Sequence, residues 1–265
     1  MRRLQLLKKI TDAGHTISQV APLDTSELLE LAQRDGSALS AMKKAAVELL
    51  PQQADDDHYE ACLAAVLNLD PYGLERAYDQ AAISMTRPAL LRKLIAPLFE
   101  EIGRLWQIGS LKILNEHMAT SVTRGFLSNL LRAVKLPDLA PIMVIATPVG
   151  QWHDVGALTV ALTAAEIGWH PVYYGPNLPA EEIAAGVKQS GARALAISIT
   201  HQLHQHPFTD ELRKLRRYVG NDVVLFVGGQ AAGDHLPVLQ EINAKYVKNI
   251  DQFSEELNSL LPANG

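Results

Sequence analysis

The stretch Gln151-Trp152-His153-Asp154-Val155-Gly156 follows an apolar segment, residues 141–147, with the composition of a buried β-strand. In an open α/β sheet, the loop after a strand lies at the carboxyl edge, where ligands bind. The imidazole of His153 is a metal-ligating group, and Gly156 lets a large group approach the backbone. A loop histidine taken alone is more often a surface or capping residue. Features elsewhere in the sequence indicate whether this loop holds a bulky ligand or its metal.

Strand and helix patterns alternate from residue 141 to the C-terminus. Expected strands cover residues 141–147, 170–175, 193–200, 222–228 and 244–248, and expected helices cover residues 157–167, 179–189, 208–219, 235–242 and 252–260. This alternation predicts an α/β fold with a right-handed, mainly parallel, doubly wound sheet. Ser198-Ile199-Thr200 ends the third expected strand and Gly228-Gly229 ends the fourth, so both are expected on the same edge as His153.

Four helices are expected before this sheet, over residues 59–69, 73–84, 88–108 and 112–133. Pro71 and Pro88 mark the first junctions, because proline is tolerated in a first helical turn and disfavours helix just before it. Short connections predict antiparallel neighbours and therefore a four-helix bundle. Trp106 stands in the third helix, and Glu116-His117 stands at the start of the fourth.

From residue 141 onward the chain resembles the vitamin B12-binding domain, whose pattern is D-x-H-x-x-G, then S-x-L or S-x-T, then G-G. The resemblance implies a Rossmann-like fold and cobalamin as the cofactor. It implies that His153 displaces the dimethylbenzimidazole of the cofactor and ligates cobalt from below. It also implies that Ser198 and Thr200 contact the displaced nucleotide tail, and that Gly228 and Gly229 are positions of close approach.

The first position of the motif departs from the family pattern, because Gln151 stands where the family usually has a carboxylate that hydrogen-bonds the histidine. An amide can still orient the imidazole but makes it less basic, so cobalt affinity or redox tuning is expected to differ. Asp154 is expected at the cofactor site with the rest of the motif. Trp152 is expected to be a corrin-edge contact or a surface anchor. His201 is expected near the lower face of the corrin, bonding its amides or tail phosphate.

The spacing from Trp106 to Glu116-His117, W-x(9)-E-H, resembles the bundle cap of the CarH/LitR family of B12-dependent photoreceptors, which are MerR-type transcriptional regulators. In that family the upper ligand is 5'-deoxyadenosyl. The resemblance implies that Trp106 packs on this group and that Glu116 and His117 contact it. The alternative is that Trp106 is bundle core and the other two form an exposed pair. The best-known member type has a histidine where this chain has Gln107, so we expect any photoproduct to carry water or another histidine, such as His117, on cobalt.

Residues 3–20 resemble the distal half of a MerR winged-helix domain, and the recognition half that precedes it in the family is absent from this sequence. The 265 residues carry a formal net charge of -5, whereas a DNA-binding domain usually presents a basic face. We expect DNA contact only through a longer form with a complete MerR domain, and otherwise action through a partner regulator. The expected domains are residues 1–50 (MerR-like remnant and connector helices), 55–135 (bundle) and 141–265 (B12-binding domain).

The resemblance implies a sensory or regulatory protein that binds adenosylcobalamin, with methylcobalamin or hydroxocobalamin as alternatives. Light would break the cobalt–carbon bond and change a homo-oligomer, and so control transcription. Two other functions stay open: a corrinoid carrier protein of a methyltransferase, and a light-independent B12 sensor. No enzymatic activity is predicted, because spacing alone places no nucleophile and base beside the cofactor.

Two further expectations concern metals and location. The loop histidines at positions 201, 204 and 206 have a spacing that could hold zinc or copper, but a contact with the corrin is favoured for His201. The sequence shows neither a bilayer-spanning apolar run nor a signal peptide, so a cytoplasmic protein without membrane contact is expected.

Overall fold

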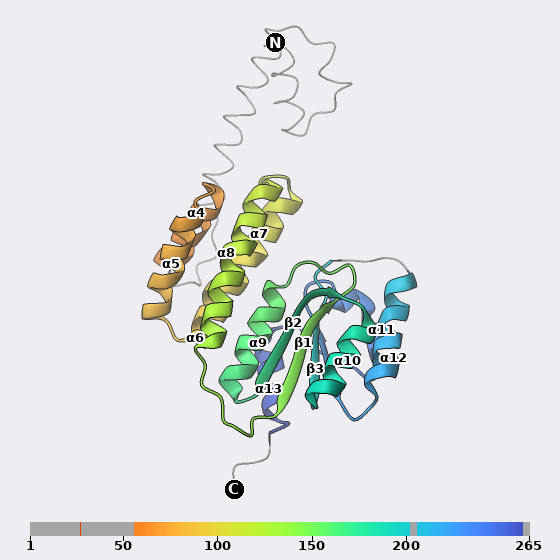
Figure 1. Ribbon diagram of the computed structural model, residues 1–265. Helices are drawn as coiled ribbons and strands as arrows, with labels where there is room; N and C mark the ends of the chain where they lie inside the picture. Colours follow the sequence, from red (N-terminus) through yellow and green to blue (C-terminus); the bar gives the residue numbers. More distant parts are fainter. Residues whose placement is uncertain (1–26, 28–55, 202–205, 262–265) are drawn as a thin grey trace. The chain divides into compact units, whose positions relative to one another are not determined.

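The computed structural model describes residue 27 and residues 56–201 and 206–261 (Figure 1). The segment that resembles part of a MerR domain, residues 3–20, lies outside these residues. By contacts the chain divides into two compact units, residues 1–83 with 93–119 and residues 84–92 with 120–265. The division passes through α8 (Ile113–Arg132), ahead of the gap between the expected domains 55–135 and 141–265. Each unit is described by itself below.

The described part of the first unit consists of helices, as predicted. It contains α4 (Asp56–Leu67), most of α5 (Pro71–Ser84), α7 (Ala96–Gln107) and the start of α8. The backbone N–H of Gly73 donates to Asp70 Oδ1 at 2.8 Å, which satisfies a donor in the first turn of α5. Buried Asn115 donates from Nδ2 to the carbonyl of Val66 at 2.8 Å, and this bond ties α8 to the end of α4.

The expected helix over residues 88–108 is interrupted, and this corrects the sequence interpretation. The chain forms α6 (Arg87–Leu90), a π-helical segment (Leu91–Ile95) and then α7. Pro97 in the first turn of α7 has no backbone N–H for the carbonyl of Lys93, four residues earlier. The π-helical segment therefore lies where the regular hydrogen-bond ladder is interrupted.

The second unit is built on a parallel sheet with the strand order β2-β1-β3-β4-β5. The five predicted strands are confirmed, as β1 (Ile142–Pro148), β2 (His170–Leu178), β3 (Ala194–Ser198), β4 (Val224–Gly228) and β5 (Lys245–Tyr246). Strand β2 runs three residues past its predicted end. Its pairing with β1 continues beyond Gly175, at φ +99°, through shifts in register up to Pro148 and Leu178.

Helices cover both faces of the sheet, as the doubly wound prediction requires. They are α9 (Val155–Ile167), α10 (Ala180–Ser190), α11 (His206–Val219), α12 (Leu236–Glu241) with a preceding 3-10 turn (Ala232–His235), and α13 (Ile250–Asn258). Alternate residues of each central strand face opposite layers: Leu195 and Ile197 pack with α10, α11 and α12, whereas Ala194 and Ala196 pack with α9 and α13.

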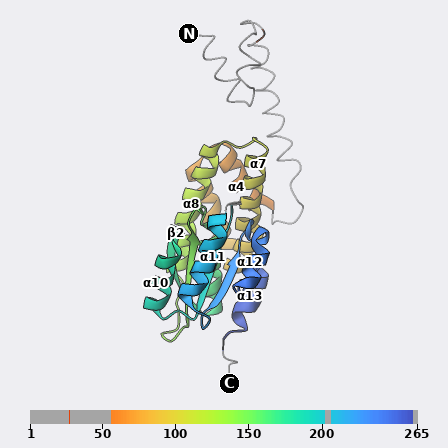
Figure 2. The ribbon, with the colours of Figure 1, turned by 90° about the vertical axis from the view of Figure 1, so that its right-hand side faces the viewer.

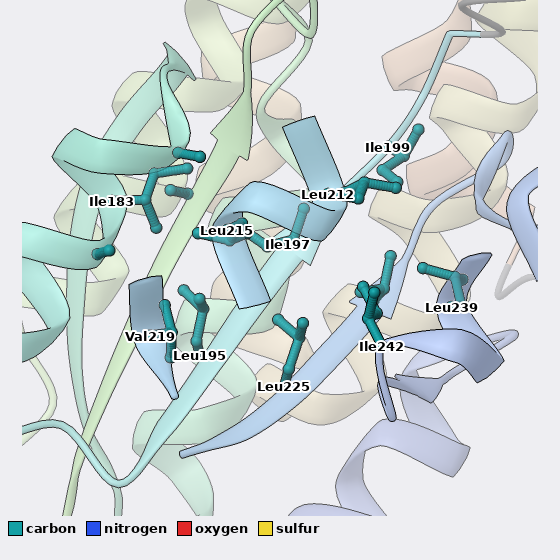
Figure 3. Close-up of a cluster of buried hydrophobic side chains, with 14 of the residues drawn as sticks. Ile183, Leu195, Ile197, Ile199, Leu212, Leu215, Val219, Leu225, Leu239 and Ile242 are labelled. Carbon is teal, nitrogen blue, oxygen red and sulfur yellow. The ribbon is translucent and has the colours of Figure 1, made fainter. Parts of the chain in front are cut away.

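Two apolar clusters, one on each face of the sheet, hold the strands in place and so position the edge at which the strands end. Figure 3 shows the first, in which Ile183, Leu212 and Leu239 meet the side chains of the strands. Figure 2 shows α10 and α11 lying in front of the sheet. Because the strands are parallel and held on both faces, the loops after β1, β3 and β4 emerge at one carboxyl edge.

Candidate cobalamin site

The loop that carries His153 leaves the sheet at its topological switch point. Strand β1 lies between β2 and β3, so the connections from β1 and β3 diverge at this place. In a sheet of order 2-1-3-4-5, the crevice at this point is the usual place for a ligand. His153 follows β1 and His201 follows β3, and their imidazole rings lie edge to face, with 4.4 Å between centroids. The predicted convergence of these two loops is therefore present.

Gln151 is fully buried and bonds the neighbouring loop. Its amide oxygen accepts from the backbone N–H of Thr200 at 2.8 Å and of His201 at 2.9 Å, and also from the Thr200 hydroxyl at 3.2 Å. Its Nε2 donates to the carbonyl of His201 at 2.9 Å. The expectation that this amide orients the imidazole of His153 is wrong in this structure, because all four hydrogen bonds go to Thr200 and His201.

Two polar side chains beside β1 hold the same loop from the other side. The hydroxyl of Thr147 donates to the carbonyl of Gln151 and accepts from the backbone N–H of Asn177 at 2.9 Å. The backbone N–H of Gly150 donates to Asn177 Oδ1 at 2.8 Å. The turn after β1 is therefore fixed to the ends of both β2 and β3.

Asp154 is also fully buried and lies at the start of α9. Its Oδ2 accepts from the hydroxyl of Tyr173 on β2 and lies 3.1 Å from Nε of Arg124 on α8. Its Oδ1 has no hydrogen-bond partner among the residues that the structure describes. Burial, and then the bond to Asp154, raise the pKa of Tyr173 well above its usual range, so the phenol stays a neutral donor.

The close approach predicted at the strand ends is made, at two glycines, by other residues of the same chain. A Cβ on Gly229, whose φ is +103°, would lie 2.3 Å from the carbonyl oxygen of Ile199, and a Cβ on Gly228 would lie 3.0 Å from Val247. These positions are needed for the packing of the chain on itself. Gly156 is different, because it is exposed and, among the residues that the structure describes, its Cβ position is bounded only by Ser198 Oγ, at 3.3 Å.

The open space at residue 156 bears on whether the residues here fit a cobalamin. A side chain at residue 156 would occupy the space beside the Ser198 hydroxyl, next to the loop of His153. Trp152 in that loop is 67% exposed, so its ring is available to a ligand. An imidazole, a hydroxyl and a large apolar ring at one sheet edge match a ligand that is bulky, apolar over much of its surface and centred on a metal.

The predicted cap residues lie in the first unit. Trp106 lies in the last turn of α7 with 45% of its surface exposed, so it is not simply bundle core. In the first turns of α8, His117 Nδ1 lies 2.6 Å from Glu116 Oε2. Because a carboxylate accepts, this contact places the proton of a neutral imidazole on Nδ1 and the lone pair on Nε2, the form that ligates a metal. The Glu116 side chain is only 14% exposed, unlike His117 at 71%.

The alternative metal cluster of loop histidines has no support among the described residues, which contain no group of three histidine, cysteine, aspartate or glutamate side chains placed for a metal. His204 and the side chain of His206 lie outside them. Arg124, Tyr173, Thr147 and Asn177 were not predicted at all. Each acts through a partner distant in sequence, and no local motif marks such residues.

The comparisons with known proteins agree with this geometry. Two family models, both described as a B12 binding domain, match residues 59–131 and 141–247. The two matched domains define the class: a cobalamin-binding protein with a helical domain ahead of a Rossmann-like domain. The coarse cofactor prediction is thus confirmed.

Two curated relatives from Myxococcus xanthus narrow this class. The HTH-type transcriptional repressor CarH is 25% identical over 239 residues, which are 90% of this chain and 77% of CarH. The HTH-type transcriptional repressor CarA is 26% identical over 182 residues, which are 69% of this chain and 60% of CarA. This chain is similar to these repressors through most of its length.

The solved structure of the Methanosarcina barkeri monomethylamine corrinoid protein has a TM-score of 0.65 and 16% sequence identity, and the match covers 78% of this chain and all of that one. This likeness confirms the predicted fold class. None of the three proteins is named as an enzyme. No helix among the described residues has the length and apolar character needed to cross a membrane.

Proposed function

We propose that this protein is a cobalamin-dependent regulator in which His153 ligates cobalt from the lower side and the helical domain senses the upper ligand. The observation that carries the proposal is the position of His153 after β1, at the switch point of the sheet, within a chain that matches two B12-binding domains. Similarity to two named transcriptional repressors over most of the chain supports a regulatory output.

On the lower side, Ser198 and Thr200 bond the nucleotide tail of the cofactor, and Gly156 leaves room for it. Trp152 covers a corrin edge. His201 supports the ring of His153 and reaches the polar side groups of the corrin. The close contact between the two imidazole rings supports this assignment.

On the upper side, Trp106 packs on a 5'-deoxyadenosyl group, and Glu116 and His117 hydrogen-bond its hydroxyls or adenine. Adenosylcobalamin supplies a cobalt–carbon bond that light breaks. Without the adenosyl group, Trp106 and Glu116 would lose these contacts, and the helical domain would change its association with other copies of the chain. The exposure of Trp106 supports this role.

Two variants make the binding test specific. His153→Gln removes the proposed ligand, and His170→Gln changes an exposed histidine at the start of β2 as a matched control. Hydroxocobalamin and adenosylcobalamin are titrated in darkness and followed by absorbance. We expect tight binding by the wild type and by His170→Gln, and loss of the histidine-ligated spectrum in His153→Gln. Equal binding and equal spectra for all three proteins would refute the assignment of His153.

Size-exclusion chromatography of the adenosylcobalamin-loaded protein, in darkness and after green light, tests the sensory part. A spectral change with a change in elution volume is expected for a light-gated regulator. A spectral change at constant elution volume would leave a B12-binding module whose output lies elsewhere. Trp106→Ala is expected to weaken adenosylcobalamin binding more than hydroxocobalamin binding, and an equal loss would count against the cap.

The corrinoid carrier is the second candidate, because a corrinoid protein shares the fold. In a carrier His153 would still ligate cobalt, but methyl groups would cycle on the upper face. The Trp106 to His117 spacing and the similarity to the CarH repressor over 90% of the chain favour the regulator. Faster transfer of a methyl group to an added thiol from methylcobalamin bound to the protein than from free methylcobalamin would favour the carrier.

A further inference from the structure

His153 is flanked in sequence by two fully buried polar side chains that are tied to different elements. Gln151 bonds the backbone of Thr200 and His201 after β3, and Asp154 bonds Tyr173 on β2 and Arg124 on α8. The backbone of His153 is therefore held on both sides. Gln151 is neutral, so the only carboxylate of the motif is the one that follows the histidine.

The position of the Asp154 carboxylate is not explained by the helix that it begins. An aspartate at an N-cap normally accepts a hydrogen bond from the first turn of the helix, but Asp154 makes no such bond. Both of its contacts use Oδ2, and Oδ1 is buried without a partner among the described residues. The carboxylate is thus turned away from α9 and toward Arg124 and Tyr173.

Arg124 supplies the positive charge that the buried carboxylate needs. Its side chain is 46% exposed, whereas that of Asp154 is fully buried, so the arginine reaches inward from the surface of α8. A buried carboxylate without a cation and hydrogen-bond donors is strongly disfavoured. Removal of Arg124 should let Asp154 turn toward water, and residue 153 must move with it.

We propose that Arg124, together with Tyr173, is a positioning residue that sets the orientation of His153 through Asp154. The proposal rests on the proposed function, in which His153 ligates cobalt. In the pattern that the chain resembles, the residue at position 151 supports the histidine. The proposal assigns this support to Arg124 on α8 and Tyr173 on β2. Outer partners of this kind fix the direction in which a metal-ligating imidazole points.

The test uses the full chain, uniformly labelled with 15N-histidine, loaded with hydroxocobalamin and reduced to the Co(II) form. In the electron paramagnetic resonance spectrum, a 15N-histidine ligand splits each cobalt line in two, whereas the unlabelled dimethylbenzimidazole splits it in three. The variants are Arg124→Gln, Arg124→Lys and Tyr173→Phe. Arg132→Gln is the matched control, because Arg132 bonds only Ser128 and Asn129 of its own helix.

We expect the two-line pattern in the wild type and in Arg132→Gln. We expect Arg124→Gln to lose much of it and to bind hydroxocobalamin about ten- to a hundredfold more weakly. Arg124→Lys keeps the charge and should restore most of the pattern, and Tyr173→Phe should shift it in the same direction as Arg124→Gln but less. This rescue would not follow if Arg124 only stabilised the fold.

Unchanged affinity and an unchanged two-line pattern in Arg124→Gln would overturn the inference and leave the proposed function intact. A wild type without the two-line pattern would overturn the proposed function itself. If Arg124→Gln does not fold, as judged by circular dichroism, Tyr173→Phe decides, and a wild-type spectrum in that variant overturns the inference.

Discussion

The ring of His153 stands edge-on to the ring of His201, with a centroid distance of 4.4 Å and an interplanar angle of 71°. The two residues come from loops after neighbouring strands, 48 positions apart in the sequence. The contact gives the proposed cobalt ligand an aromatic neighbour that limits its rotation.

His201→Ala tests this contact while keeping the hydrogen bonds to Gln151, which use the backbone of His201. We expect hydroxocobalamin to bind about tenfold more weakly, since the imidazole of His153 loses a support. Equilibrium titration followed by absorbance measures the change. His170→Ala, at an exposed histidine, should bind as the wild type does. Wild-type affinity in His201→Ala would show that the ring contact contributes nothing to ligation.

Gln151→Glu should destabilise the second unit even though it restores the carboxylate expected in the family. The new oxygen would replace the Nε2 donor and face the carbonyl of His201, and a charge would be buried. We expect a loss of about 3 kcal/mol in the free energy of unfolding, measured by urea denaturation. The control Gln189→Glu changes an exposed residue of α10 and should stay within about 0.5 kcal/mol. A stable Gln151→Glu variant would contradict the hydrogen bonds described.

Gly229→Ala should be among the most damaging alanine substitutions in the sheet domain. The added Cβ would lie 2.3 Å from the Ile199 carbonyl at a φ of +103°, so both the backbone and the neighbouring loop would have to move. We expect a loss of more than about 2 kcal/mol by urea denaturation. Gly125→Ala on α8 meets no atom within 4 Å and should be neutral or stabilising by up to about 1 kcal/mol. A neutral Gly229→Ala variant would contradict the close approach of these loops.

The first unit should lose stability at alkaline pH through Tyr59. Burial, with Glu101 adding to it, raises the pKa of Tyr59 from its ordinary value of 10 to about 12. The neutral phenol is favoured in the folded state, so its contribution is fully present below about pH 10 and is lost as the pH rises toward about 12. Over this pH range, the free energy of unfolding should fall by about 2 to 3 kcal/mol less in Tyr59→Phe than in the wild type. Tyr72→Phe, at an exposed position, should leave the pH profile unchanged. If Tyr59→Phe has the wild-type profile, this tyrosine does not govern the alkaline transition.

The sequence predicted the sheet domain well because its signals are local. Strands such as β3 (Ala194–Ser198) are short apolar runs bounded by glycine and polar residues, and each is followed by a helix of amphipathic or apolar pattern. The same local signals placed His153 and Thr200 at strand ends. The π-helical segment before Pro97 was missed because the pattern of apolar residues continues through it.

The partners of the site were not predictable in the same way. Gln151 was judged by its chemistry relative to His153, two residues away, but its bonds reach residues about fifty positions later. Arg124 and Tyr173 meet Asp154 only because α8 and β2 come to the same loop. Which of several polar side chains pairs with a buried carboxylate depends on the packing of these elements.

The hydrogen bonds of Gln151 also bear on the free energy with which a ligand can be bound. A loop that is free before binding loses conformational entropy when it closes on a ligand. Here the turns after β1 and β3 are joined during folding by an uncharged group, so that loss is incurred before the ligand arrives. Because an amide neither gains nor loses a proton over the pH range in which proteins fold, the paired loops keep their arrangement whether the medium is acidic or alkaline.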